Sequence, residues 1–189
     1  MMYKIQNLTS SYASEQPEIS SVLQSTLKKN NIKIRSITPV SILFTPWPTG
    51  NPQTDQNITG SLSWNPLNRT VTITYHIELP YKTLPGDYSR VLKWYLLKRN
   101  EEHSCCFRHL NTGFLYPGED GSGITLKGSR KTSAAGIGET VEMILLQLHD
   151  ILETEAGPIT GILSGNPPDS LKQYLLNEIK ITLSELNLL

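Results

Sequence analysis

Two histidines and two cysteines stand close together in the stretch from His103 to His109. His103, Cys105 and His109 are separated by even numbers of residues, and on an extended strand such side chains project from the same face. An imidazole beside a cysteine can stabilise the reactive thiolate, so Cys105 next to one of these histidines, or next to His76, is a candidate nucleophile for a small hydrolase or transferase. Free cysteine is also among the most buried residue types, which makes Cys105 and Cys106 candidates for small core residues of a strand.

Other site-forming patterns are incomplete in this sequence. A zinc site needs three or four converging ligands, and no second cysteine or histidine pair stands at a familiar spacing to complete such a set. Gly123 and Gly128 have the interval of a phosphate-binding loop, but Ser129 and Arg130 follow where lysine and then serine or threonine are required. We therefore expect neither a metal site nor a cofactor.

The composition limits the kinds of partner that the protein could bind. The chain has 189 residues, and its 17 basic and 17 acidic side chains cancel. Because no net field steers the protein toward nucleic acid or an anionic membrane, any charged partner would have to be bound by a local patch. The first thirty residues lack a secretion signal, and no apolar stretch approaches the roughly 20 residues that a bilayer crossing needs. We expect a cytoplasmic protein that binds neither nucleic acid nor membrane.

The first predicted elements follow from a change in hydrophobic period. Apolar residues recur at helical spacing over residues 17–29, and a β-branched run follows over residues 32–44. Pro39 interrupts that run, which indicates one bent or edge strand. Residues 45–56 contain three prolines and a glycine and are typical of an exposed loop. Trp47 in this loop is a candidate partner anchor, although a tryptophan folded back over the core is the commoner outcome.

Two hairpins are predicted in the middle of the chain. Apolar and polar residues alternate strictly over residues 71–79, and residues 61–64 precede them across a short turn. This pattern gives a sheet with one apolar and one polar face, so helices should cover only one side. A second hairpin is predicted from residues 104–116 and 124–127, which flank a glycine-rich turn.

Three further amphipathic stretches predict helices. The first spans residues 87–99, and the second starts after Gly138 and ends at the break formed by Gly157 and Pro158. The last runs from about 169 to 187, and its apolar stripe is broad enough to contact two surfaces. We expect a flexible segment over residues 1–16 and one domain over residues 17–189, to which this last helix is appended.

These elements predict an α+β fold, in which an antiparallel sheet of about five strands carries helices mainly on one face. Their order, α-βββ-α-ββ-α-α, resembles the type III secretion chaperone-like fold shared with YbjN-type proteins, over about residues 17–156. The most suggestive stretches are residues 94–100, 105–110 and 124–126 and the helix from Glu139. That family has no invariant catalytic motif. The resemblance implies a cytoplasmic protein-binding module, often a homodimer, that holds an extended segment of a partner against its sheet and helices.

We therefore expect a non-enzymatic adaptor or chaperone-like domain with a protein partner, and a homodimer is possible. The candidate binding residues are the loop tryptophan and apolar residues of two predicted helices, namely Trp47, Tyr88, Leu92, Tyr95 and Leu183. The cysteine-dependent enzyme built on Cys105, with His103 and His109, remains one alternative. A domain that binds a small ligand between sheet and helices is the other.

Overall fold

The computed structural model describes residues 18–78, 95–99, 111–115 and 123–163, together with six single residues between 169 and 184. Residues 18–29 form the first helix, and residues 95–99 are also helical. The remaining elements are β1 (Lys33–Ile37), β2 (Ile42–Thr45), α2 (Pro52–Asn57), β3 (Ile58–Asn65), β4 (Thr70–Glu78), β5 (Asn111–Leu115), β6 (Gly123–Lys131) and α4 (Ile137–Leu163).

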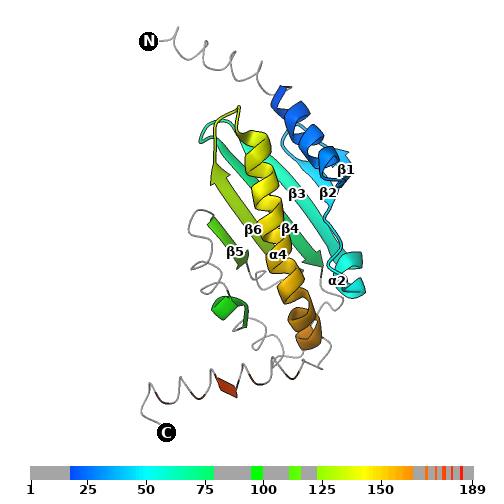
Figure 1. The fold of residues 1–189 in the computed structure, drawn as a ribbon, viewed down its shortest axis with the longest axis vertical. Helices are drawn as coiled ribbons and strands as arrows, with labels where there is room; N and C mark the ends of the chain where they lie inside the picture. The colour runs from blue at the N-terminus through cyan, green and yellow to red at the C-terminus, as the bar shows by residue number, and fades with distance from the viewer. Residues whose placement is uncertain are drawn as a thin grey trace.

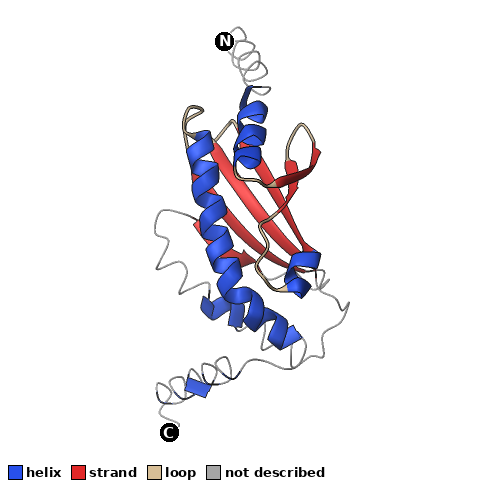
Figure 2. Ribbon diagram, turned by 45° about the vertical axis from the view of Figure 1, so that its right-hand side comes forward, coloured by secondary structure: helices blue, strands red, loops and turns tan. Residues whose placement is uncertain are grey.

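The strands form one six-stranded sheet in the order β1-β2-β3-β4-β6-β5, and each neighbouring pair is antiparallel. The helix of residues 18–29 and the long helix α4 lie across one face of this sheet (Figures 1 and 2). The predicted α+β class, the antiparallel sheet and the one-sided helices are confirmed. The second predicted hairpin is confirmed where β5 pairs with β6.

The sixth strand arises because residues 32–44 form a hairpin, so the prediction of one bent strand there was wrong. The backbone N–H of Thr38 donates to the carbonyl of Ser41 (2.8 Å), and the N–H of Ser41 donates to Oγ1 of Thr38 (3.0 Å). Pro39 lies inside this turn, where its missing N–H interrupts no strand ladder. A proline that looked like a kink in one strand therefore marks the boundary between two.

The core lies between the apolar face of the sheet and the two helices. On β4, Val71, Ile73, Tyr75 and Ile77 are buried, while the residues between them are half-buried and polar. α4 supplies a matching buried face that includes Leu148. The alternation that predicted the hairpin is therefore the pattern that separates core from surface.

Two local predictions were wrong near the ends of α4 and β2. α4 continues through Pro158, because Ala156 and Ile159 on either side are each only 2% exposed and their packing offsets one lost backbone hydrogen bond. The loop predicted over residues 45–56 contains α2, whose first turn is capped by the side chain of Asn51. Asn51 followed by proline is a helix-start signal that the proline-rich composition hid.

Several predictions fall outside the described residues. Of the helix predicted over 87–99, only residues 95–99 are described, and they are helical. The six single residues between 169 and 184 are helical and exposed, but most of the predicted last helix is not described. No helix among the described residues is both long and apolar enough to cross a membrane.

Candidate functional site

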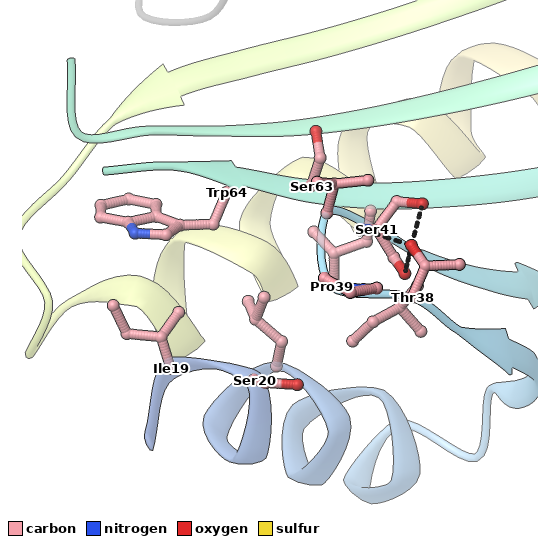
Figure 3. Close-up of a pocket in the computed structure, with 11 residues that line it drawn as sticks. Ile19, Ser20, Thr38, Pro39, Ser41, Ser63 and Trp64 are labelled. Carbon is pink, nitrogen blue, oxygen red and sulfur yellow. Dashed lines mark hydrogen bonds between the residues drawn. The ribbon is translucent and has the colours of Figure 1, made fainter. Parts of the chain in front are cut away.

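A hollow of about 50 Å³ lies where the β1–β2 turn, β3 and the helix of residues 18–29 meet (Figure 3). The ladder between β2 and β3 ends at the pair Ile42–Leu62, whereas β3 continues to Asn65. The last residues of β3 therefore pair with β4 on one side but have no partner in β2 on the other, and the hollow lies on that open side. Its lining residues are Ile19, Ser20, Leu23, Thr38, Pro39, Val40, Ser41, Ile42, Leu62, Ser63 and Trp64.

The turn beside the hollow exposes two large apolar side chains. Val40 lines the hollow and is 76% exposed, and Ile37, next to the lining residue Thr38, is 50% exposed. Single exposed apolar residues are common, but here two of them adjoin a concave, largely apolar surface. Such a surface is suited to an apolar side chain of another molecule.

Trp64 adds an unused hydrogen-bond donor to the wall of the hollow. Its indole Nε1 is buried and has no hydrogen-bond partner in the part of the chain that the structure describes. A buried donor without an acceptor costs about 1–3 kcal/mol. Because this nitrogen is closed to solvent, a ligand in the hollow would reach it only after the indole or its neighbours shift. The lining therefore selects a ligand by its apolar surface.

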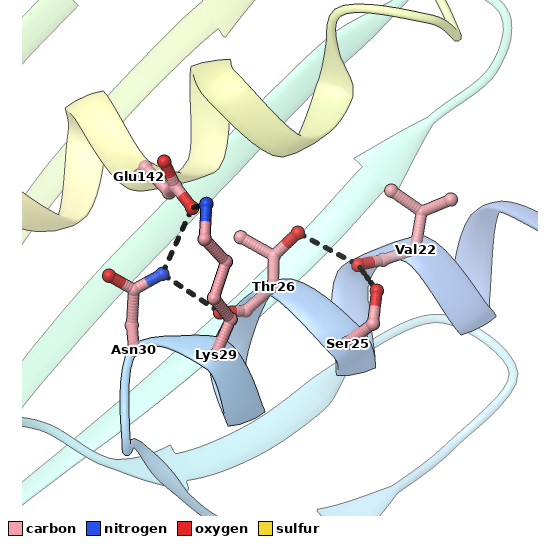
Figure 4. A network of polar contacts seen from close by, with 6 residues as sticks. All are labelled: Val22, Ser25, Thr26, Lys29, Asn30 and Glu142. Atoms are coloured by element: carbon pink, nitrogen blue, oxygen red, sulfur yellow. Dashed lines mark hydrogen bonds and ion pairs between the residues drawn. The ribbon is translucent and has the colours of Figure 1, made fainter.

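The helix that lines the hollow is fixed to α4 by a polar network (Figure 4). Glu142 of α4 accepts hydrogen bonds from Nζ of Lys29 (2.9 Å) and from Nδ2 of Asn30 (3.2 Å). Asn30 also donates to the carbonyl of Thr26 and so closes the end of its own helix. The hydrogen bond from Lys29, followed by that from Asn30, lowers the pKa of Glu142 below its ordinary value.

Replacing Glu142 by glutamine should therefore lower stability near neutral pH but not in acid. A carboxyl whose pKa is lower in the folded state contributes stability above its unfolded pKa, and this contribution is lost as the pH falls through the folded value. The difference in thermal unfolding between wild type and Glu142→Gln should be full at pH 7 and should shrink as the pH falls below the ordinary pKa of glutamate. A difference that persists unchanged in acid would contradict this role of the ion pair.

A buried ionic cluster fixes the other end of α4. Glu155 is 0% exposed, and its carboxylate accepts hydrogen bonds from the hydroxyl of Tyr95 and from Nε of Arg99 (2.6 Å). Tyr95, predicted as a binding residue, is itself only 4% exposed. Its position inside the fold ties residues 95–99 to α4, and its binding role stays a prediction.

Trp47 lies at the edge of the core. Its indole N–H donates to the carbonyl of Asn30 (2.9 Å), and its ring meets that of His149 edge-on at 5.4 Å between centroids. The side chain is half-buried, so it joins the loop before α2 to the first helix and to α4. A binding role for Trp47 likewise stays a prediction.

The other predicted site residues cannot be placed in the described structure. Tyr88, Leu92, Leu183, Cys105 and the histidines His103 and His109 lie outside the described residues. The alternative of a cysteine-dependent enzyme therefore stays a prediction. Among the described residues, no group of three histidine, cysteine or acidic side chains could hold a metal ion.

Sequence reasoning missed the hollow and the ionic cluster. The one signal for the hollow was Pro39, because it marks a turn that leaves the sheet near the end of β3. Glu155 gave no signal, since an acidic residue toward the end of a predicted helix is expected on the surface. Its partner Arg99 stands 56 residues away in the chain.

Known proteins resemble this chain in structure but not in sequence. No protein-family model matches it, and neither does any curated protein. A chain in the crystal structure of the ExsC–ExsE complex is 14% identical, with a TM-score of 0.47 over 74% of this chain and 92% of that one. YbjN from E. coli is 7% identical, with a TM-score of 0.45 over 71% and 88%. The resemblance predicted from the order of elements is thus found, and it concerns the fold alone.

Proposed function

We propose that the protein is a non-enzymatic binding module that holds an extended segment of a partner protein at the β1–β2 hairpin. An apolar side chain of the partner fills the hollow beside Val40. The partner's main chain continues along the outer edge of β1. The observation that carries this proposal is the hollow itself, which adjoins the exposed apolar side chains of Val40 and Ile37.

The position of β1 supports an extended ligand. β1 is the end strand of the described sheet, so one row of its backbone N–H and C=O groups has no neighbouring strand. Adding a strand to such an edge is a common mode of peptide recognition, in which main-chain hydrogen bonds supply affinity and side-chain pockets supply specificity. The bulge between Ile34 and Ser36 and the charges of Lys33 and Arg35 disfavour unselective pairing. This edge should therefore bind only a segment that also fits the hollow.

Replacing Val40 by glutamate should weaken this binding without unfolding the protein. We select peptides on the wild-type chain from a displayed library. They should bind Val40→Glu at least about tenfold more weakly, because an apolar anchor in the hollow would bury the new carboxylate without a partner. Leu67→Glu is the matched control, since Leu67 is 82% exposed and lies in the β3–β4 turn. Isothermal calorimetry measures both variants.

The results for these variants distinguish a partner protein from a second copy of this chain. Equal binding by wild type and Val40→Glu would remove the hollow from the proposal. A second copy of the chain is the other occupant that the experiment distinguishes, in keeping with the homodimer expected from the sequence. Sedimentation would identify this case if wild type were a dimer and Val40→Glu a monomer, with Leu67→Glu unchanged.

A further inference from the structure

The charges of this neutral chain are distributed unevenly around the proposed site. Between Glu18 and Asp55 the sequence contains four basic residues and no acidic one. This stretch forms most of the first helix, β1, β2 and the turn that lines the hollow. The basic residues are Lys28, Lys29, Lys33 and Arg35.

The four cations belong to two consecutive elements, the end of the first helix and β1. Lys28 and Lys29 end the first helix, and the chain enters β1 at Lys33 after the turn through Asn30 and Asn31. Lys29 pairs with Glu142, and Arg35 donates from Nε to the hydroxyl of Thr45 (2.8 Å). Among the described residues, Lys29 is thus the one of the four that pairs with a carboxylate. Lys28, Lys33 and Arg35 are exposed and have no carboxylate partner among the described residues, and we call these three residues the basic patch. They flank β1 from two sides: Lys28 lies on the helix that covers the core face, whereas Lys33, next to the core-facing Ile34, projects from the other face.

β1 sets the distance between this basic patch and the hollow. The strand runs from Lys33 to Ile37 and leads directly into the lining residues Thr38–Ile42. At about 3.3 Å per residue, Lys33 lies roughly 13 Å along the edge from Ile37. A peptide laid along β1 with its anchor in the hollow would therefore place side chains four to six residues away at the level of Lys33. Because side chains of a strand alternate between its two faces, some of them would point to the side of Lys33 and others to the side of the helix that carries Lys28.

We propose that the segment bound at this site is acidic, with aspartate or glutamate side chains about four to six residues from an apolar anchor. This inference rests on the proposed function and specifies the chemistry of its partner. The basic patch attracts the acidic end and fixes the direction of the segment along β1, while the hollow fixes its register. Opposite charges on a rim act mainly on specificity and association rate, so the interaction is weakened by salt.

Selection from a displayed library of random twelve-residue peptides on the full-length chain tests the proposal. Wild type should enrich peptides that pair an apolar residue with acidic residues at the stated separation. Their synthetic versions should bind the double variant Lys28→Glu/Lys33→Glu roughly fivefold or more weakly. Selection repeated on that variant should enrich basic residues at the same positions. The control is Lys131→Glu, which changes an exposed lysine at the end of β6.

Each outcome decides between the two proposals. Apolar peptides without acidic residues, lost in Val40→Glu and unaffected by Lys28→Glu/Lys33→Glu, would overturn the acidic partner and leave the proposed function standing. Lys131→Glu changes the net charge by half as much as the double variant. A loss of binding free energy half as large as that of the double variant would therefore reduce the result to net charge and would also overturn the inference. Failure of wild type to enrich any peptide would overturn both. Because Lys28 and Lys33 are exposed, thermal unfolding of the double variant should match wild type.

Discussion

Replacing Glu155 by alanine should lower the free energy of unfolding by about 3 kcal/mol or more. The carboxylate is fully buried, and the side chain of Arg99 that it meets is only 20% exposed. Removing Glu155 takes from the Arg99 guanidinium the carboxylate that it meets in the interior, and the weaker compensation of this largely buried charge is the main cost. The hydroxyl of Tyr95 loses its acceptor in the same step. Urea denaturation followed by circular dichroism measures the change.

Glu153→Ala is the matched control for this experiment. Glu153 lies two residues away on the same helix and is exposed, so its replacement should change stability by no more than about 0.5 kcal/mol. Glu155→Gln keeps the shape of the side chain but removes its charge, and should fall between the two. If Glu155→Ala and Glu153→Ala were equally mild, the cluster would not be the attachment between residues 95–99 and α4.

The contrast between Glu153 and Glu155 illustrates where sequence patterns stop being informative. Both residues are acidic and both stand in the second half of α4. Helical periodicity gives the buried face of α4 but assigns apolar residues to it, so a buried acid is invisible until its partner is known. That partner comes from another helix, and only the tertiary fold brings the two together.

Regular patterns, in contrast, were sufficient for most of the sheet. The β3–β4 hairpin was predictable because its alternation extends over many residues and because the turn carries its own signal in Asn65, whose side chain accepts from the backbone N–H of Leu67. The β1–β2 hairpin was missed because both strands are short and both contain β-branched residues, so that they look like one run. A four-residue turn inside such a run looks the same as a kink.

The same miss concealed the candidate site. The hollow exists because the β1–β2 hairpin turns away before β3 ends, which is a relation between strand lengths in space. A single strand over residues 32–44 would have covered the end of β3 and left no concave surface. A correct count of strands is therefore the step on which both the binding proposal and its basic patch depend.

Gly60→Ala should be the most damaging change of a single methyl group in the centre of the sheet. Gly60 of β3 stands beside Phe44 and opposite Tyr75, and an added Cβ would meet Cζ of Phe44 at 2.5 Å. Phe44 is fully buried, and its ring packs edge-on against that of Tyr75 at 6.0 Å between centroids. The ring cannot move away from position 60 without disturbing this packing. Overpacking of this kind costs about 1–3 kcal/mol, and we expect the upper part of that range.

A double-mutant cycle distinguishes overpacking from a general effect of alanine in β3. Phe44→Leu opens space above position 60, so Gly60→Ala should cost less than half as much in that background as in wild type. Ser61→Ala, the neighbouring position on the other face of the strand, should change stability by about 0.5 kcal/mol or less. Additive costs in the cycle would mean that the backbone of β3, rather than the ring of Phe44, requires glycine at this position. An equal loss in Ser61→Ala would point to the strand as a whole.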